Sequence, residues 1–162
     1  MGLVLTIDHL ARERQTARDQ NKRFVFTNGC FDLLHRGHVE ILKAAKDLGD
    51  LLCVGVNSDQ SIRRLKGPRR PIVPEADRAA VVAALESVDF VTIFDEDTPR
   101  SVIARLRPDV LVKGADYGID EIVGRSEVEE AGGIVVRIPL YGGLSTENLL
   151  KEIARRYRDL VD

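Results

Sequence analysis

Two histidines stand three residues apart near the start of the chain, in the stretch His35-Arg36-Gly37-His38. Imidazoles this close could bind a metal ion, form a nucleophile–base pair, or donate hydrogen bonds to the oxygens of one phosphate group. The stretch follows an apolar run and precedes a helical pattern, so it should lie at a helix start. Free N–H groups and a partial positive charge there favour phosphate, and Gly37 has no side chain to keep a phosphate from the backbone. We therefore favour phosphate binding over a pair of ordinary loop histidines.

A second candidate phosphate site lies near the end of the chain, at Ser145-Thr146. Ser145 is a favourable N-cap, and the helix that it would open offers another positive end. A plain capped helix would explain the same residues on their own. Glu147 in the first turn suits the helix dipole but would repel a phosphate, so the role of this position stays open.

The segment 63–74 is rich in positive charge and in proline, and five of the eight residues from 63 to 70 are basic. Many basic loops are only solvated surface, but this one follows a predicted strand. It could fold over a triphosphate as a lid that excludes water. Lys66 is the best candidate in it to neutralise an α-phosphate or a departing pyrophosphate.

Other charged residues near predicted strand ends have both a functional and a structural interpretation. Lys113 and Asp116 follow the fourth predicted strand, where ligands of such sheets bind, but they could equally be a surface cation and a turn former. Asp32 could orient His35 or cap the first helical turn. Asp59 could cap the helix after the second predicted strand.

The hydrophobic pattern predicts the strands and helices that must position these residues. Short apolar runs alternate with helical patterns, which indicates an α/β domain with a doubly wound, Rossmann-like parallel sheet of about five strands. Its ligand site should lie beyond the carboxyl ends of the strands, where the loops converge. The expected strands are 24–26, 51–56, 90–94, 110–112 and 134–138, and the expected helices are 39–48, 75–85, 98–106, 126–131 and 145–160.

Residues 1–22 are expected to form an N-terminal helical extension outside this unit, used for packing or for dimerisation, and residues 23–162 the main domain. The formal net charge of −2 argues against nucleic acid as the main partner. Cys30 and Cys53 lack the spacing of a zinc site and suit a reduced, cytoplasmic protein. No apolar run approaches a membrane span and no convincing signal peptide is present, so we expect no membrane partner.

The segment 28–38, which reads Asn28-Gly29-Cys30-Phe31-Asp32-Leu33-Leu34-His35-x-Gly37-His38, resembles the signature of a nucleotidyltransferase superfamily that includes the class I aminoacyl-tRNA synthetases. It looks most like the cytidylyltransferase-like branch, and Ser145-Thr146 is similar to the Ile-Ser-Thr-Thr motif that holds the β- and γ-phosphates. The resemblance implies catalytic roles for His35, His38 and Lys66. It implies nucleotide-binding roles for Thr27, Asn28, Gly29, Phe31, Gly37, Arg78, Lys113, Gly114, Asp116, Ser145 and Thr146, and weaker acceptor-binding roles for Asp32, Asn57 and Asp59.

Three further stretches, 65–71, 109–117 and 123–133, are similar to the branch of this family that makes ADP-heptose. That resemblance implies transfer of AMP from ATP to D-glycero-β-D-manno-heptose 1-phosphate, which gives an ADP-sugar and pyrophosphate on the way to lipopolysaccharide. Mg²⁺ would accompany ATP and bridge phosphate oxygens mostly through water, since no all-protein metal cage is visible in the sequence. The resemblance also implies a separate heptose kinase as a pathway partner, and we expect a homo-oligomer, namely a dimer.

Two alternatives stay open. The first is a cytidylyltransferase for glycerol 3-phosphate or a similar small phosphate, although Leu140 stands where that enzyme carries an arginine. The second is a nucleotide-binding domain without catalytic activity, against which the presence of both histidines, Lys66 and the Ser-Thr pair argues.

Overall fold

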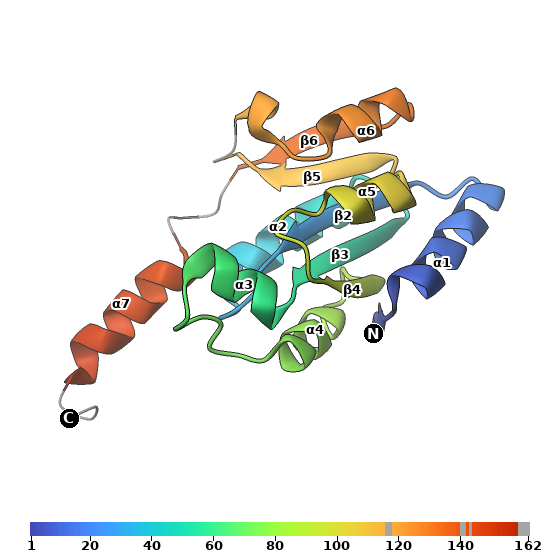
Figure 1. The fold of residues 1–162 in the computed structure, drawn as a ribbon. Coiled ribbons are helices and arrows are strands. Elements are labelled where there is room, and N and C mark those ends of the chain that lie inside the picture. The colour runs from blue at the N-terminus through green and yellow to red at the C-terminus, as the bar shows by residue number, and fades with distance from the viewer. Residues whose placement is uncertain (116–117, 140–141, 143, 159–162) are drawn as a thin grey trace.

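A six-stranded parallel sheet forms the centre of the computed structural model, which describes residues 1–115, 118–139, 142 and 144–158 (Figure 1). Its strand order is β1-β4-β3-β2-β5-β6, so the order reverses between β2 and β5. This arrangement confirms the Rossmann-like class. The strands are β1 (Leu3–Val4), β2 (Phe24–Gly29), β3 (Leu51–Asn57), β4 (Phe90–Phe94), β5 (Val110–Gly114) and β6 (Ile134–Ile138).

Helices cover both faces of the sheet because the strands are apolar on both sides. Val25 and the side chains that share its face pack against α2 and α4, whereas Phe24 and Phe26 face α1, α5 and α6. The α-helices are α1 (Ile7–Asp19), α2 (Arg36–Lys46), α3 (Asp59–Lys66), α4 (Glu75–Ala83), α5 (Arg100–Leu106), α6 (Arg125–Glu130) and α7 (Thr146–Arg156), with a short 3₁₀ helix η1 at Ile119–Glu121. Within the described ranges, no helix is long and apolar enough to cross a membrane.

The N-terminal segment supplies the strand that the sequence did not predict. Residues 3–4 pair with β4, with Leu3 opposite Phe90, and make six strands instead of about five. Two residues are too few for an alternating pattern to be visible. The expected helix is present as α1, and its Leu10 and Ala17 are buried in the same core as the sheet.

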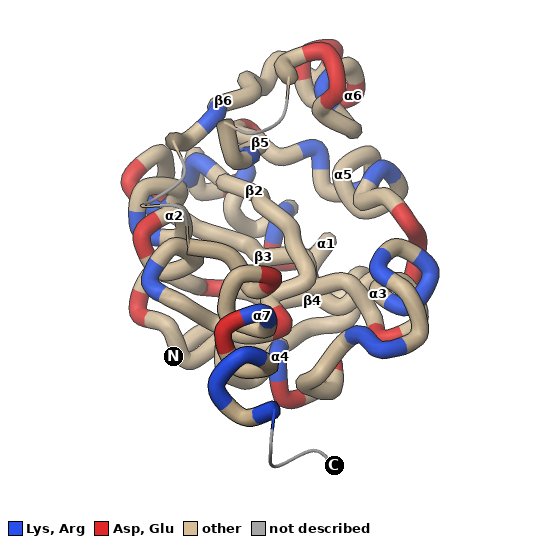
Figure 2. Tube along the Cα trace, turned by 90° about the vertical axis from the view of Figure 1, so that its left-hand side faces the viewer, with Lys and Arg blue, Asp and Glu red and all other residues tan. Residues whose placement is uncertain are grey.

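Two helices differ from their expected bounds at places that matter for the site. The helix α2 begins at Arg36 instead of residue 39, so the histidine motif itself forms the first turn. The prediction of a loop over 63–66 was wrong, because α3 extends to Lys66 and the loop begins at Gly67. Ser58 starts α3 by accepting a hydrogen bond from the Ser61 amide at 3.0 Å. Figure 2 shows basic positions gathered on α3 and the loop after it.

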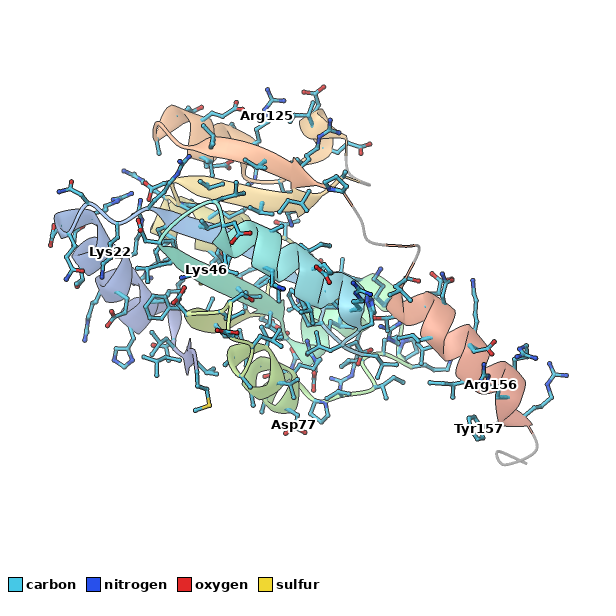
Figure 3. The ribbon with its side chains drawn as sticks, turned by 180° about the vertical axis from the view of Figure 1, so that it is seen from behind. Lys22, Lys46, Asp77, Arg125, Arg156 and Tyr157 are labelled. Atoms are coloured by element: carbon cyan, nitrogen blue, oxygen red, sulfur yellow. The ribbon has the colours of Figure 1, made fainter. Side chains whose placement is uncertain are left out.

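The last helix, α7, projects from the body of the molecule (Figure 1). No side chain of α7 is buried, and Arg156 and Tyr157 lie at its outer end, away from the sheet (Figure 3). Its first turn is the part that meets the rest of the chain, since the Thr146 hydroxyl donates to the Leu33 carbonyl at 3.3 Å. The helix start is therefore held beside the loop that follows β2.

Candidate active site

A cavity of about 470 Å³ lies at the carboxyl end of the central strands, where the strand order reverses. This is the position expected for a ligand site in a doubly wound sheet. Residues from β2, β3 and β5 meet residues from α2 and α3 around it. The predicted site residues that line it are Thr27, Asn28, Gly29, Phe31, His38, Asn57, Lys66, Lys113 and Gly114.

The two histidines are stacked on each other at the start of α2. Their ring centroids are 3.9 Å apart with an interplanar angle of 26°, and the Phe31 ring lies 5.2 Å from His38. The Nδ1 atoms of both rings are buried and have no hydrogen-bond partner in the described part of the chain. A methyl group at Gly37 would lie 3.0 Å from the His35 ring, so glycine here makes room for the imidazole itself.

The environment keeps both imidazoles neutral near neutral pH. Burial, and secondarily the neighbouring His35, lowers the pKa of His38 from 6.5 to about 4. Burial also lowers the pKa of His35. Two cationic rings in contact would repel each other, so the pair can charge fully only if an anion compensates. The site is therefore suited to stabilise negative charge that arrives with a ligand.

The second predicted phosphate site adjoins the first. Ser145 caps α7 as predicted, because its hydroxyl accepts a hydrogen bond from the Asn148 amide at 3.1 Å. The Leu144 side chain lies 3.8 Å from where a Cβ at Gly37 would stand. The N-terminus of α7 therefore rests against the histidine motif. The starts of α2 and α7 are therefore adjacent, and a helix start is in general a favourable position for an anion.

Glu147 interacts with neighbouring cations. It forms an ion pair of 2.8 Å with Lys151 on the same helix. The hydrogen bond from Lys151 is the main reason that its pKa is lowered, and the charges of Lys66 and Arg70 lower that pKa further. The acid in the first turn of α7 therefore stays ionised and is directed along the helix, toward Lys151.

Two lysines from different elements line the cavity. Lys66 ends α3 and lines the cavity with an exposed side chain. Lys113, at the end of β5, donates a hydrogen bond to the side-chain carbonyl of Asn28, and both residues line the cavity. The hydroxyl of Thr27 donates to the Val112 carbonyl at 3.0 Å, which fixes β2 against β5 below them.

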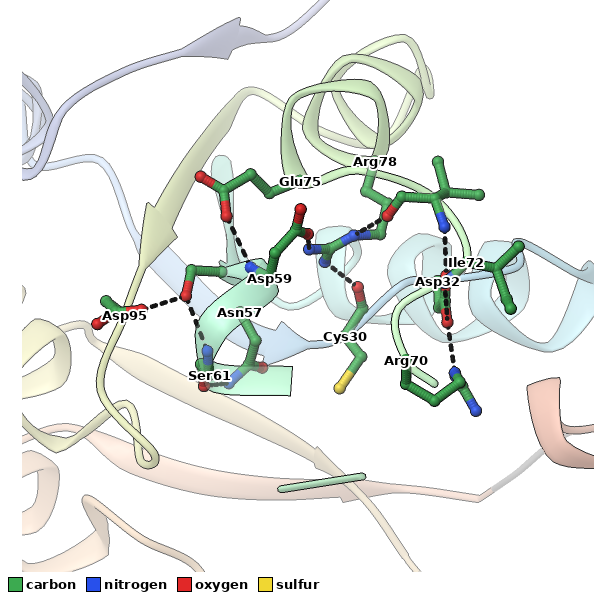
Figure 4. A network of polar contacts seen from close by, with 12 residues as sticks. Cys30, Asp32, Asn57, Asp59, Ser61, Arg70, Ile72, Glu75, Arg78 and Asp95 are labelled. Atoms are coloured by element: carbon green, nitrogen blue, oxygen red, sulfur yellow. Dashed lines mark hydrogen bonds and ion pairs between the residues drawn. The ribbon is translucent and has the colours of Figure 1, made fainter. Parts of the chain in front are cut away.

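Asp32 does not orient His35 in this structure. Its fully buried carboxylate accepts hydrogen bonds from Arg70 Nε at 2.6 Å, from the Ile72 amide at 2.8 Å and from the Val73 amide at 2.9 Å (Figure 4). The prediction failed because the loop after α3 returns to this carboxylate, and no local pattern shows that contact. Asp32 instead holds that loop against the histidine motif.

Arg78 also has a structural position that differs from the predicted one. Its side chain is fully buried and donates to the Val73 carbonyl at 2.8 Å, the Cys30 carbonyl at 2.6 Å and the Asp59 carboxylate at 2.8 Å (Figure 4). Each of the three guanidinium nitrogens donates one hydrogen bond, and the buried side chain does not line the cavity, so it is not placed to contact a nucleotide there in this conformation. Arg78 instead ties the loop after β2 to the ends of α3 and α4, and Asp59 takes part in the same tie.

The remaining predicted site residues and potential metal ligands are placed as follows. The side-chain amide of Asn57 lines the cavity and donates to the Ser61 hydroxyl at 3.0 Å. Asp116 lies outside the described residues, as do Leu140 and Gly143. In the described ranges, no group of three or more His, Cys, Asp and Glu side chains could hold a metal ion.

The structure adds cavity residues that the sequence reasoning missed. The turn before α5 and the segment at η1 contribute Asp97, Thr98, Pro99, Glu121, Ile122 and Val123. The turn could have been found, because it follows a strand and the same rule that selected the other loops applies to it. The segment at η1 shows no such signal, because it reaches the cavity only through the path of the chain after β5.

Comparison with known proteins agrees with this geometry. The family model described as cytidylyltransferase-like matches residues 26–152. The bifunctional protein HldE of Methylobacillus flagellatus is 52% identical over 151 residues, which cover 93% of this chain and 31% of that protein. HldE of Geobacter sulfurreducens is 51% identical over 154 residues, which cover 95% of this chain and 31% of that protein. The chain thus spans about a third of the length of these curated relatives.

Solved structures show the same fold. A lipopolysaccharide core biosynthesis protein from Thermoplasma volcanium matches with a TM-score of 0.65 and 34% identity, over 75% of this chain and 99% of that one. Pantoate-beta-alanine ligase from Francisella tularensis, solved with β-γ ATP and β-alanine, matches with a TM-score of 0.65 and 15% identity, over 98% of this chain and 78% of that one. At that low identity, the second match is informative about the fold alone.

Proposed function

This chain belongs to the cytidylyltransferase-like family of nucleotidyltransferases, and we propose that it transfers AMP from ATP to a sugar 1-phosphate. The acceptor that we propose is D-glycero-β-D-manno-heptose 1-phosphate, and the products are an ADP-sugar and pyrophosphate. The observation that carries the proposal is the stacked pair His35 and His38 beside the start of α7, of which His38 lines the cavity together with Lys66. The similarity to HldE and to a lipopolysaccharide core biosynthesis protein supports the choice of acceptor.

In the proposed reaction, a phosphate oxygen of the sugar 1-phosphate attacks the α-phosphorus of ATP in line. A new P–O bond forms to the sugar phosphate, and the bond between the α-phosphorus and the bridging oxygen to the β-phosphate breaks. The bond electrons leave with pyrophosphate. A phosphate monoester is already anionic near neutral pH, so the attack needs no general base. The enzyme has to position the reactants and compensate their charge.

Each residue has a role that follows from its place. The histidines donate hydrogen bonds to the α-phosphate oxygens and to the bridging oxygen, where negative charge grows. Lys66 adds a positive charge at the same region. Ser145 and Thr146, with the amide groups at the start of α7, hold the β- and γ-phosphates. Asn28, Lys113 and their neighbours at the ends of β2 and β5 face the nucleoside.

Mg²⁺ enters this scheme as part of the ATP substrate. The carboxylates that line the cavity, Asp97 and Glu121, belong to no metal-binding cluster among the residues that the structure describes. We therefore propose that phosphate oxygens and water hold the ion. A separate kinase that phosphorylates the sugar at its anomeric oxygen would supply the acceptor. A cytoplasmic location and a dimer remain predictions.

A pyrophosphate-release assay with a matrix of substrates tests the proposal. ATP and CTP are each combined with heptose 1-phosphate and with glycerol 3-phosphate. We expect release with ATP and heptose 1-phosphate above all other combinations. Release with CTP and glycerol 3-phosphate would favour the cytidylyltransferase alternative, and nucleotide binding without release from any acceptor would favour a domain without catalytic activity.

Two substitutions test the assigned roles. His38→Ala should lower kcat by roughly 100-fold or more while the protein stays folded, because it removes a donor to the reacting phosphate. Lys66→Ala should lower kcat with little change in Tm, and Arg63→Ala, an exposed cation on the same helix, serves as its matched control. A near-normal kcat in His38→Ala would remove the histidine from the mechanism.

A further inference from the structure

The loop after α3 brings a second cation, besides Lys66, close to the first turn of α7. Arg70 lies four positions after Lys66, and its side chain is 17% exposed. Its Nε atom donates to Asp32 at 2.6 Å, whereas its two terminal nitrogens make no hydrogen bond to a described residue. Figure 4 shows the outer end of the guanidinium on the side away from Asp32. The side chain is therefore fixed at one edge and open at the other.

The anchor of Arg70 is adjacent to the start of α7. Asp32 holds Arg70, and the next residue, Leu33, accepts the hydrogen bond from the Thr146 hydroxyl at 3.3 Å. The charges of Lys66 and Arg70 both reach Glu147 in the first turn of α7, where they lower its pKa. Lys66 and Arg70 thus lie close enough to the first turn of α7 for their charges to act on it.

The buried carboxylate makes this arrangement rigid. Asp32 has a side chain that is 0% exposed, and besides Arg70 it accepts hydrogen bonds from the backbone amides of Ile72 and Val73. A buried carboxylate must keep such partners, because losing them would leave an uncompensated charge. These contacts hold the loop backbone at Ile72 and Val73 and hold the guanidinium at its Nε atom. An arginine held by Nε presents its two terminal N–H₂ groups as a fork, which suits phosphate oxygens.

We propose that Arg70 binds the β- and γ-phosphates of the nucleotide and the pyrophosphate that leaves, and that Asp32 is its positioning residue. This inference rests on the proposed nucleotidyl transfer and adds a cation to it beyond Lys66. Arg70 complements the start of α7, since the loop and the helix contact the phosphates from two sides. Neutral histidines leave the charge of pyrophosphate largely uncompensated, and Arg70 supplies part of the missing positive charge.

Binding of inorganic pyrophosphate with Mg²⁺, measured by titration calorimetry on the full chain, tests the proposal. Arg70→Gln should raise the Kd for pyrophosphate by about tenfold or more, since a charge-assisted bidentate contact is lost. Arg69→Gln removes the neighbouring, exposed arginine and should change the Kd by less than about threefold. The Kd for AMP, which lacks the β- and γ-phosphates, should stay unchanged in both variants. Unchanged pyrophosphate binding in Arg70→Gln would overturn the proposal.

A second pair of variants covers the case in which Arg70→Gln does not fold. Arg70→Lys keeps a cation for Asp32, but one ammonium cannot form the same fork, so pyrophosphate binding should still weaken severalfold. Asp32→Asn should weaken pyrophosphate binding as well. The double variant Asp32→Asn, Arg70→Lys should lose less binding free energy for pyrophosphate than the sum of the losses in the two single variants. Additive losses would show that Asp32 does not act through Arg70.

The outcomes separate this inference from the proposed function. If the chain transfers AMP to heptose 1-phosphate and Arg70→Gln keeps its pyrophosphate affinity, the role of Arg70 fails and the function stands. If Arg70→Gln loses pyrophosphate affinity but no acceptor supports pyrophosphate release, the proposed reaction fails and the phosphate site stands. If the unmodified chain binds no pyrophosphate, the role of Arg70 is refuted directly.

Discussion

The stacked histidine pair should make the stability of the folded protein depend on pH in a way that one substitution removes. The pKa of His38 falls from 6.5 to about 4 on folding, because burial and the neighbouring His35 disfavour its cation. Its folded pKa lies below its unfolded pKa, so the unfolded chain binds the proton first as the pH falls. The stabilising contribution is therefore complete above pH 6.5 and is lost progressively as the pH falls toward 4.

The expected size follows from the pKa difference. Between pH 6.5 and about pH 5, one proton taken up only by the unfolded chain costs about 2 kcal/mol of unfolding free energy. His38 is only partly buried, so solvent screening should reduce this to about 1 kcal/mol. The variant His38→Asn has no titrating ring at this position. Between pH 7.5 and pH 5, its free energy of unfolding should therefore fall by about 1 kcal/mol less than that of the unmodified chain.

Urea denaturation at both pH values, followed by circular dichroism, measures the difference. Protonation of carboxylates also destabilises the fold at low pH, but that effect is common to the compared proteins and cancels. His9→Asn is the matched control, because His9 is an exposed residue on α1, remote from the pair. It should keep the pH dependence of the unmodified chain. Equal pH dependence of His38→Asn and the unmodified chain would refute the reasoning from burial.

Two further substitutions test the scaffold. Arg14→Met should destabilise the fold by about 2 to 3 kcal/mol in urea denaturation, because it removes a 2.7 Å ion pair with Asp109 and hydrogen bonds to the carbonyls at the end of α5. These contacts lie away from the cavity, so kcat should stay unchanged. Gly124→Ala should lower Tm more than Gly132→Ala: both have positive φ, but only at Gly124 would the new methyl lie 2.5 Å from the Ile103 side chain. Equal Tm losses would contradict the steric argument.

Most of the sheet could be predicted from the sequence because its signal is local. The third and fifth expected strands, 90–94 and 134–138, match β4 and β6 in the structure. Short runs that are apolar on both faces favour strands of a covered sheet, and the helical period between them marks the crossovers. The edge strand β1 was not predicted, because two residues are too few to show a periodic pattern and its partner strand lies about ninety residues away in the chain.

The candidate site was predictable where chemistry and position coincide in a short segment. The His35–His38 motif and the Ser145 cap are defined by residue type and by adjacency to a helix start, which the sequence contains. The roles of Asp32 and Arg78 were not predictable in the same way. The partners of Asp32 lie 38 to 41 positions away in the chain, and those of Arg78 lie 5, 19 and 48 positions away. Such contacts produce no periodic pattern in the sequence.

The sequence by itself determined the fold class, the edge of the sheet at which the cavity lies and the presence there of residue types able to bind phosphate. Periodicity and helix-start chemistry act over a few residues, so a linear pattern is enough for them. Only the tertiary structure decided which charges are free to meet a ligand. Burial and partner geometry assign Asp32 and Arg78 to holding loops and bring the histidine rings to 3.9 Å. They also leave the terminal nitrogens of Arg70 without a hydrogen bond to a described residue.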